Sequence, residues 1–386
     1  MPNYSGKWNL PTVMQAEGAG TWPVPPLGVP SELWGMGNGN YGALGQGNTT
    51  TYSSPVQVGA LTDWAIVASS THGLAVKTDR SLWSWGKNQF GALGNGNTTN
   101  TSSPVQIGAL TTWATVGSNE YHSAAIKTDG TLWAWGWNTK GQLGQNNTTS
   151  YSSPVQVGAL TNWLEVACST YATMATKTDG TLWTIGDNVY GQLGDGSTTN
   201  RSSPVQVGAL TTWSKVAGTG MYCMALKTDG TIWGWGRNAS GGLGQGNTTD
   251  YSSPVQVGAL TTWSKVKGGG DLNGAEWVMA IKTDGTLWAW GENTKGQLGN
   301  GNTTDVSSPI QVGALTTWSQ VSPVQKSSYA LKTDGTLWAW ADNGDGQLGL
   351  GSTTGYSSPV QVGALTTWGA LPIAASSITQ MALITV

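Results

Sequence analysis

Few side chains in this sequence could support acid–base or metal chemistry. The 386 residues include two histidines, His72 and His122, and two cysteines, Cys168 and Cys223. The histidines occupy one column of an internal repeat. In other copies that column holds Ala172, Tyr222, Trp277 and Ser327. A column that accepts such different side chains is not a shared catalytic site, so we interpret the histidines as packing or capping residues. Because no metal-ligand spacing and no nucleophile–base pair stands out, we expect no catalytic residue, cofactor or metal.

A glycine-rich motif, GxNxxGxLGxGxTT, superficially resembles a phosphate-binding loop. One copy begins at Gly236. Phosphate-binding loops of this kind open a helix, whereas this motif recurs in every copy of the repeat with no helical pattern after it. Glycines at these spacings permit left-handed turns and close backbone approach. We therefore expect the motif to be structural.

Three independent columns define the internal repeat. A Leu-Trp or Ile-Trp pair places Trp at 34, 83, 133, 183, 233, 288 and 338. A second Trp column runs through 64, 113, 163, 213, 263, 318 and 368. Ser-Ser-Pro begins at 53, 102, 152, 202, 252, 307 and 357. The chain therefore contains seven copies of a unit of about 50 residues, which is typical of repeat architectures.

Each copy predicts four short strands and no helix. In one copy the runs are Pro204–Val207, Trp213–Val216, Tyr222–Thr228 and Thr231–Trp235. Asp229-Gly230, between the last two runs, is a strong hairpin signal. Four strands in about 50 residues, repeated seven times, indicate an all-β, seven-bladed β-propeller.

The two ends of the chain each carry half of a hairpin. Met381–Val386 matches the strand that precedes Asp-Gly in other copies, but the chain ends there. Glu32–Gly37 matches the strand that follows Asp-Gly, with no partner before it. We therefore predict that these two strands pair and close the ring, leaving no open sheet edge.

The motif LWAWGxNxxGQLGxG, followed by SSPVQVGAL, resembles the RCC1 repeat family over residues 31–386. The resemblance implies a seven-bladed propeller. The family includes exchange factors for a nuclear GTPase, which typically carry a basic tail and diverged repeats, and plant ultraviolet receptors. The receptors have a Gly-Trp-Arg-His-Thr motif, whereas no Trp stands two residues before His72 or His122. Neither specialised role is therefore expected from the motifs.

Composition excludes several classes of function. Charged residues make up 10% of the chain and the net charge is −3, with no basic stripe of the kind that nucleic-acid binding requires. No apolar run approaches a membrane span, and the N-terminus lacks the pattern of a secretory signal. The two cysteines fall in different columns, so we expect two small buried side chains and no disulfide.

Residues 1–30 lie outside the repeats and read as an N-terminal arm with a Pro-rich linker. Their pattern Y-x-G-x-W-x-L…Q-A-x-G-x-G-x-W-P is similar to N-terminal segments of structural and tail-fibre-like proteins of marine bacteriophages. The resemblance implies an arm that docks on another virion protein. The alternative is an arm that folds back on its own propeller. The candidate anchors are Trp8, Leu10, Val13, Met14 and Trp22.

Variation between the copies concentrates between the second and third strand runs. One copy is longer there, from Gly268 to Trp277. Loops on a rigid scaffold are where binding residues gather, although neutral drift gives the same pattern. The candidate contact residues are Asp271, Asn273, Glu276 and Trp277.

These observations favour a non-enzymatic structural or binding protein. The leading interpretation is a bacteriophage virion component, a tail appendage, fibre-associated or capsid-decorating propeller. It would bind other virion structural proteins through residues 1–30, and beyond them a host receptor or glycan. One alternative is a cytoplasmic, RCC1-like regulator that binds a GTPase or other protein. Another is a carbohydrate-binding propeller for host attachment, with Trp137 and Trp277 stacking on sugars. We expect neither nucleic-acid binding nor a membrane span.

Overall fold

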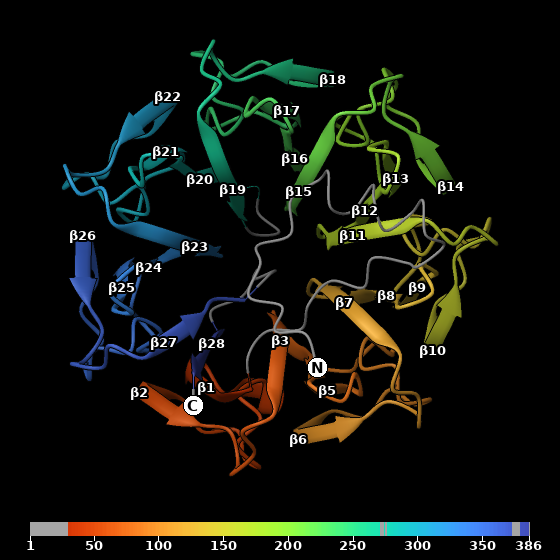
Figure 1. The fold of residues 1–386 in the computed structure, drawn as a ribbon, viewed down its shortest axis with the longest axis horizontal. Coiled ribbons are helices and arrows are strands. Elements are labelled where there is room, and N and C mark those ends of the chain that lie inside the picture. The colour runs from red at the N-terminus through yellow and green to blue at the C-terminus, as the bar shows by residue number, and fades with distance from the viewer. Residues whose placement is uncertain (1–29, 271–273, 275, 373–378, 386) are drawn as a thin grey trace, which may run out of the picture.

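The structure is a computed structural model that describes residues 30–270, 274, 276–372 and 379–385. This part of the chain forms a ring of seven antiparallel blades (Figure 1). Five blades are separate four-stranded sheets, and the other two are joined into one eight-stranded sheet through the pairing of Ser31 with Trp64. The predicted seven-bladed propeller is confirmed.

Each blade has four strands, ordered from the ring axis outward. The innermost strands are β3 (Trp64–Ser69), β7 (Trp113–Ser118), β11 (Trp163–Cys168), β15 (Trp213–Thr219), β19 (Trp263–Gly270), β23 (Trp318–Val324) and β27 (Trp368–Ala370). The second strands are β4 (His72–Lys77), β8 (His122–Lys127), β12 (Ala172–Lys177), β16 (Tyr222–Lys227), β20 (Glu276–Lys282), β24 (Ser327–Lys332) and β28 (Thr379–Thr385). The third strands are β5 (Leu82–Gly86), β9 (Leu132–Gly136), β13 (Leu182–Gly186), β17 (Ile232–Gly236), β21 (Leu287–Gly291), β25 (Leu337–Ala341) and β1 (Ser31–Gly37). The outermost strands are β6 (Thr101–Gln106), β10 (Tyr151–Gln156), β14 (Arg201–Gln206), β18 (Tyr251–Gln256), β22 (Val306–Gln311), β26 (Tyr356–Gln361) and β2 (Tyr52–Gln57).

The four strand runs read from Pro204 belong to two blades. The run at Pro204 lies in β14, which pairs with β13 through Thr184 and Val205. The next three runs lie in β15, β16 and β17, which form the following blade with β18. The strand runs were therefore located correctly, but the blade begins at the second Trp column.

The ring closes as the sequence predicts. β1 and β28 pair antiparallel over seven positions, from Ser31 with Thr385 to Gly37 with Thr379. Leu33 and Leu383 face each other across this pairing and both are buried. The last blade is thus built from both ends of the described chain, and it has no unpaired third strand.

The hydrophobic core lies between neighbouring blades. A typical cluster joins Met224 and Leu226 of one blade to Trp263, Val278 and Trp290 of the next. Trp263 and Trp290 are almost fully buried, and replacing such a side chain by Ala usually costs about 3–5 kcal/mol. Because each interface uses the same columns, the repeat sequence by itself specifies most of the core.

The Lys-Thr-Asp-Gly-Thr-Leu-Trp motif forms a local network at the hairpins that carry it. In one copy Asp129 accepts a hydrogen bond of 2.6 Å from the Thr131 hydroxyl, which accepts one of 2.8 Å from the Trp133 indole. The Lys127 ammonium lies 3.6 Å from the Trp133 ring centroid and 5.0 Å from that of Trp113. The motif therefore combines a polar turn with a cation–π contact.

One hairpin carries Arg80 where the other hairpins have Gly. Its backbone has φ 66°, close to the φ of 77° at Gly230. The turn therefore keeps the same left-handed conformation, which non-glycine residues adopt at a cost. The absence of Gly in this copy changes the strain of the turn and leaves its conformation almost unchanged.

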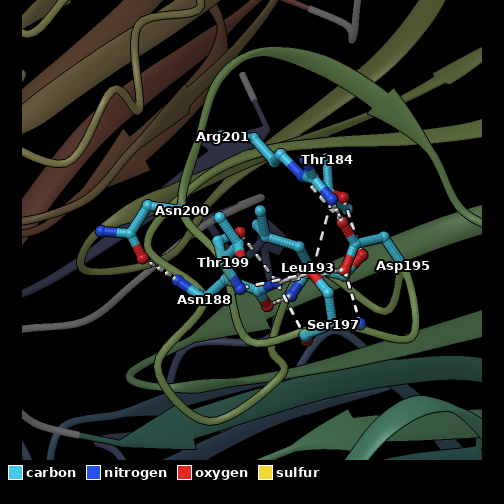
Figure 2. Close-up of polar contacts among 8 residues, drawn as sticks. All are labelled: Thr184, Asn188, Leu193, Asp195, Ser197, Thr199, Asn200 and Arg201. Carbon is cyan, nitrogen blue, oxygen red and sulfur yellow. Dashed lines mark hydrogen bonds and ion pairs between the residues drawn. The ribbon is translucent and has the colours of Figure 1, made fainter.

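The glycine-rich motif folds around a buried Asn, as Figure 2 shows for Asn188. Its side-chain amide donates to the carbonyl oxygens of Ser197 and Thr199, and its side-chain oxygen accepts a hydrogen bond of 2.9 Å from the Leu193 amide. Asn138, Asn238 and other copies make equivalent bonds. The loop thus satisfies its own backbone groups, in agreement with a structural role.

The histidines and cysteines are interior residues. Nε2 of His72 lies 2.8 Å from the Ser123 hydroxyl, and Nε2 of His122 lies 3.0 Å from the Thr173 hydroxyl, so each ring bridges two blades. Burial lowers the pKa of His72 to about 4 and that of His122 to about 3. Cys168 and Cys223 are buried free thiols.

Helical structure is minimal in the part of the chain that the structure describes. Its one helical element is a single 3-10 turn, η1 (Asn40–Gly42). No helix there has the length and apolar character to cross a membrane.

Candidate protein-binding face

Two variable columns of the repeat meet at one face of the ring. In each case a backbone hydrogen bond joins the turn between the first and second strands of a blade to the residue that follows the third strand. The backbone amide of Trp137 donates to the Tyr121 carbonyl at 2.9 Å, and that of Arg237 donates to the Met221 carbonyl at 3.1 Å. Equivalent bonds occur in six blades of the described chain. We call the surface formed by these turns and by the loops after the third strands the loop face.

Aromatic side chains gather on one part of the loop face. They come from four consecutive blades, and we call them the aromatic arc: Tyr41, Phe90, Tyr121, Trp137, Tyr171 and Tyr190. Tyr41 is 51% exposed and the other five are half-buried, so the arc is part of the surface.

The centre of the arc is a packed cluster of rings. Phe90 stacks on Trp137 with 5.3 Å between ring centroids and 21° between ring planes. Tyr121 and Tyr171 meet Trp137 edge-on, with centroid separations of 5.1 and 5.4 Å. Such contacts are worth about 0.5–1.5 kcal/mol each beyond burial, so the cluster is a preformed, rigid surface.

Two cations contact rings of the arc. The Lys87 ammonium lies 5.4 Å from the Tyr41 ring centroid and 5.2 Å from that of Tyr121. The Arg237 guanidinium lies 5.6 Å from the Tyr190 ring centroid. Trp, Tyr and Arg, which all occur here, are the residues enriched at protein-interface hot spots.

Elsewhere the same columns carry charged side chains. The positions after the third strands β21 and β25 hold Glu292 and Asp342, and the neighbouring loops hold Lys295 and Asp345. Aromatic rings of the loop face thus gather on four blades, where the same columns also hold the Lys140–Asp187 ion pair. We call the part of the face that holds Glu292, Lys295, Asp342 and Asp345 the charged sector.

The prediction that Trp277 and Glu276 are contact residues is wrong. Both are fully buried, and Trp277 packs with Met279 and Trp340 in the core between two blades. The physical reason lies in their position at the start of β20, where the Trp277 column points into the blade interface. The same column holds the buried His72. The position of Trp277 in the same column as His72 therefore already indicated that its side chain is buried.

The other predicted site residues are not placed by the structure. Asp271 and Asn273 lie outside the described residues, as do the anchors Trp8, Leu10, Val13, Met14 and Trp22. The sequence did not indicate Phe90, Tyr121 and Tyr171 as a group. Phe90 stands in a different column from the two tyrosines, and the rings come together only in the folded ring.

Burial controls the ionisation of groups at this face. It raises the pKa of both Tyr121 and Tyr171 above the usual tyrosine range. Burial raises the pKa of Glu276 to about 7, while the nearby Arg237 opposes the shift. Among the described residues no group of three or more His, Cys, Asp or Glu side chains could hold a metal ion.

Comparison with known proteins places the chain among repeat proteins. The model of the regulator of chromosome condensation (RCC1) repeat matches residues 31–76, 79–126, 129–176, 179–226, 229–275, 284–330 and 334–378. The chain belongs to the RCC1 repeat family. The match begins at residue 31, and no comparison supports the resemblance of residues 1–30 to bacteriophage tail-fibre-like proteins. A search of curated protein sequences found no match.

Three solved structures show the same RCC1 propeller fold. Prp20p from Saccharomyces cerevisiae, described with its binding to Gsp1p and histones, has a TM-score of 0.81 at 18% identity, covering 93% of each chain. Yeast RCC1 (Prp20) bound to Kap60 has a TM-score of 0.80 at 18% identity, covering 93% of this chain and 90% of that chain. Human WBSCR16 has a TM-score of 0.79 at 18% identity, covering 92% and 99%. At this identity the likeness defines the fold alone.

Proposed function

We propose that this RCC1-family propeller is a non-enzymatic binding protein that holds a protein partner on the aromatic arc. The supporting observation is the packed cluster around Trp137, where an otherwise uniform scaffold presents unlike residues from successive blades. Tyr, Trp and Arg dominate interface energetics because they bury a large area at a small entropy cost. The rings already hold one another in place, so little ordering is needed when a partner binds.

A cellular setting has more support than the virion setting. The family match and the RCC1-type neighbours favour an RCC1-like regulator, and the structure of Prp20p is described with Gsp1p and histones. In its specific form, the proposal is that the arc contacts a GTPase of the Gsp1p kind. The virion role depended on residues 1–30, whose resemblance has no support in the comparisons.

Sugar binding is less well supported by the same residues. Trp277 is fully buried, and Phe90 stacks on Trp137. Sugar recognition needs an open ring face, whereas a protein partner can use the edges and hydroxyls of the whole cluster. Binding to a glycan array is therefore measured beside binding to proteins in the test.

The test measures binding of the purified chain to Gsp1p and to core histones by surface plasmon resonance. A Trp137→Ala, Tyr171→Ala variant should weaken protein binding by about 100-fold or more, since hot-spot truncations cost about 2 kcal/mol or more each. The matched control, Lys295→Ala with Asp345→Ala, changes the charged sector of the same face and should bind normally.

Release of labelled nucleotide from Gsp1p tests the proposal that the arc contacts a GTPase. Acceleration by wild type and by the control variant, but not by the Trp137 variant, would support a GTPase regulator. Histone binding without nucleotide release would restrict the proposal to protein binding. Binding to glycans and to neither protein, or no binding at all, would contradict it.

A further inference from the structure

One blade of the ring differs from the others at the lysine of its hairpin. In the blade formed by β3 to β6, Nζ of Lys77 lies 3.3 Å from Oδ1 of Asp63. The column of Asp63 holds an uncharged residue in the other blades that carry the lysine: Thr112, Asn162, Thr212, Thr262 and Thr317. The chain therefore supplies a carboxylate to this hairpin lysine in one blade and leaves it out in five.

The lysine of the next blade, Lys127, is buried without a charged partner in contact. It is 8% exposed, and its ammonium contacts the rings of Trp113 and Trp133. Among the described residues this ammonium has no hydrogen bond and no ion pair. Asp129 attracts it from two residues away, but that carboxylate accepts hydrogen bonds from the amide and the hydroxyl of Thr131. The three N–H donors of Lys127 are thus available to a ligand.

The backbone places Thr112 as it places Asp63. The Asp63 carbonyl accepts a hydrogen bond of 2.9 Å from the Thr78 amide, and the Thr112 carbonyl accepts one of 2.7 Å from the Thr128 amide. The Asp63 side chain is 44% exposed, and Thr112 is exposed as well. The position that a carboxylate takes over Lys77 can therefore be reached from solvent over Lys127.

Lys127 lines a groove of about 550 Å³ between two blades, which we call the Lys127 groove. Trp113 and Trp133 line it beside the lysine, and Val105 and Leu110, which are 38% and 49% exposed, add apolar surface. The equivalent groove one blade earlier has about 240 Å³, and its lining does not include the paired Lys77. The Lys127 groove thus combines an ammonium with exposed apolar side chains.

We propose that the Lys127 groove binds an acidic peptide segment, in which an Asp or Glu carboxylate contacts the Lys127 ammonium as Asp63 contacts Lys77. An apolar residue beside the acidic one would pack on Val105 and Leu110, which a small free carboxylate would leave in water. The carboxylate that the chain itself places on this column is also carried by a peptide.

The same lysine arrangement recurs around the ring. The ammonium groups lie 3.5 to 3.8 Å from the ring centroid of the third-strand Trp, without an ion pair among the described residues, at Lys177, Lys227, Lys282 and Lys332. Several acidic segments, or one long segment, could therefore contact successive blades, and linked contacts add to one another.

This site is independent of the proposed protein-binding face. β8 follows Tyr121 of the aromatic arc and ends at Lys127, so the Lys127 groove lies at the other end of the strand from the loop face. The Trp137→Ala, Tyr171→Ala variant should therefore bind the acidic peptide normally. Failure of one proposal leaves the other standing.

The experiment is an NMR titration of the isotope-labelled full chain with the peptide acetyl-Gly-Leu-Asp-Leu-Gly-amide. The indole N–H signals of Trp83, Trp133 and Trp233 report on three blades, and Trp→Phe variants assign them. The signals of Trp133 and Trp233 should shift saturably, whereas that of Trp83 should not, because Asp63 already occupies Lys77. The same peptide with Asn in place of Asp should bind about fivefold more weakly, as expected for a partly exposed ion pair.

Two substitutions in the Asp63 column test the proposal with opposite signs. Thr112→Asp should reduce the Trp133 shift about tenfold, because the new carboxylate occupies Lys127, and Trp233 should still respond. Thr112→Asn, which adds no charge, is the matched control and should respond as wild type does. Asp63→Asn frees Lys77 and should give Trp83 a saturable shift that wild type lacks.

A purely structural role of Lys127 would produce neither the loss nor the gain. The proposal would be overturned by an unchanged Trp133 shift in Thr112→Asp, by equal binding of the Asp and Asn peptides, or by the absence of saturable shifts in wild type. Equal shifts with sodium acetate at the same concentration would overturn the assignment of a peptide as the ligand.

Discussion

Nη1 of Arg237 lies 3.3 Å from Oε1 of Glu276, a carboxylate with no exposed surface. Arg237 also donates a hydrogen bond of 2.8 Å to the Gly274 carbonyl and contacts the ring of Tyr190. One guanidinium therefore connects the long loop before β20 to the aromatic arc.

Replacing Glu276 should change how stability depends on pH. Burial raises the folded pKa of Glu276 to about 7 from 4.5, so the folded state holds this proton more tightly than the unfolded state. Stability from this group is present at low pH and is lost as pH rises from about 4.5 to 7. Denaturant titrations at pH 5 and pH 8 should show Glu276→Gln losing less stability over this interval than wild type. An identical loss in both proteins would contradict the assignment.

The two histidines should affect the pH dependence of stability in the direction opposite to Glu276. Their folded pKa values, about 4 for His72 and about 3 for His122, lie below the ordinary value of 6.5. The unfolded state therefore binds more protons, and stability is lost as pH falls from about 6.5. A His72→Gln, His122→Gln protein should lose less stability between pH 6.5 and 4 than wild type. A steeper acid loss in the variant would argue against neutral buried rings.

Arg80→Gly should stabilise the protein by about 1 kcal/mol, because Gly adopts a left-handed backbone without the steric cost that Arg pays. A buried guanidinium nitrogen of Arg80 also lacks a hydrogen-bond partner within the described residues. Thermal unfolding provides the measurement. The reciprocal control is Gly230→Ala, whose added Cβ would lie 2.2 Å from the Thr261 carbonyl oxygen and should cost about 2 kcal/mol or more. A lower melting temperature for Arg80→Gly would show that the arginine is stabilising.

Ring closure can be tested with two leucines. Leu383 is 3% exposed in β28, whereas Leu365 is 45% exposed in a loop between blades. Leu383→Ala should cost about 2–5 kcal/mol, and Leu365→Ala less than about 0.5 kcal/mol. Deleting residues 381–386 should destabilise the ring further, since β1 would lose its antiparallel partner. Unchanged melting of the truncated protein would exclude this closure as a source of stability.

The sequence by itself determined the number of blades, the strand runs and the closing pair. Its Trp, Ser-Ser-Pro and Asp-Gly columns recur, and periodic core positions such as Trp213 and Trp263 lie between blades whatever the loops contain. It also indicated that the histidine column is structural. The same reasoning, applied to Trp277, would have predicted its burial, but the length of the loop before it suggested a surface role.

Only the tertiary structure decided which variable residues meet. Phe90, Tyr121 and Trp137 stand in different columns, and Glu165, Lys215 and Lys265 stand about 50 residues apart in one column. The curvature of the ring brings the first set onto one sector of the loop face and the second set to one cavity. Such proximity depends on the angle between successive blades, and a linear repeat does not encode that angle in any single copy.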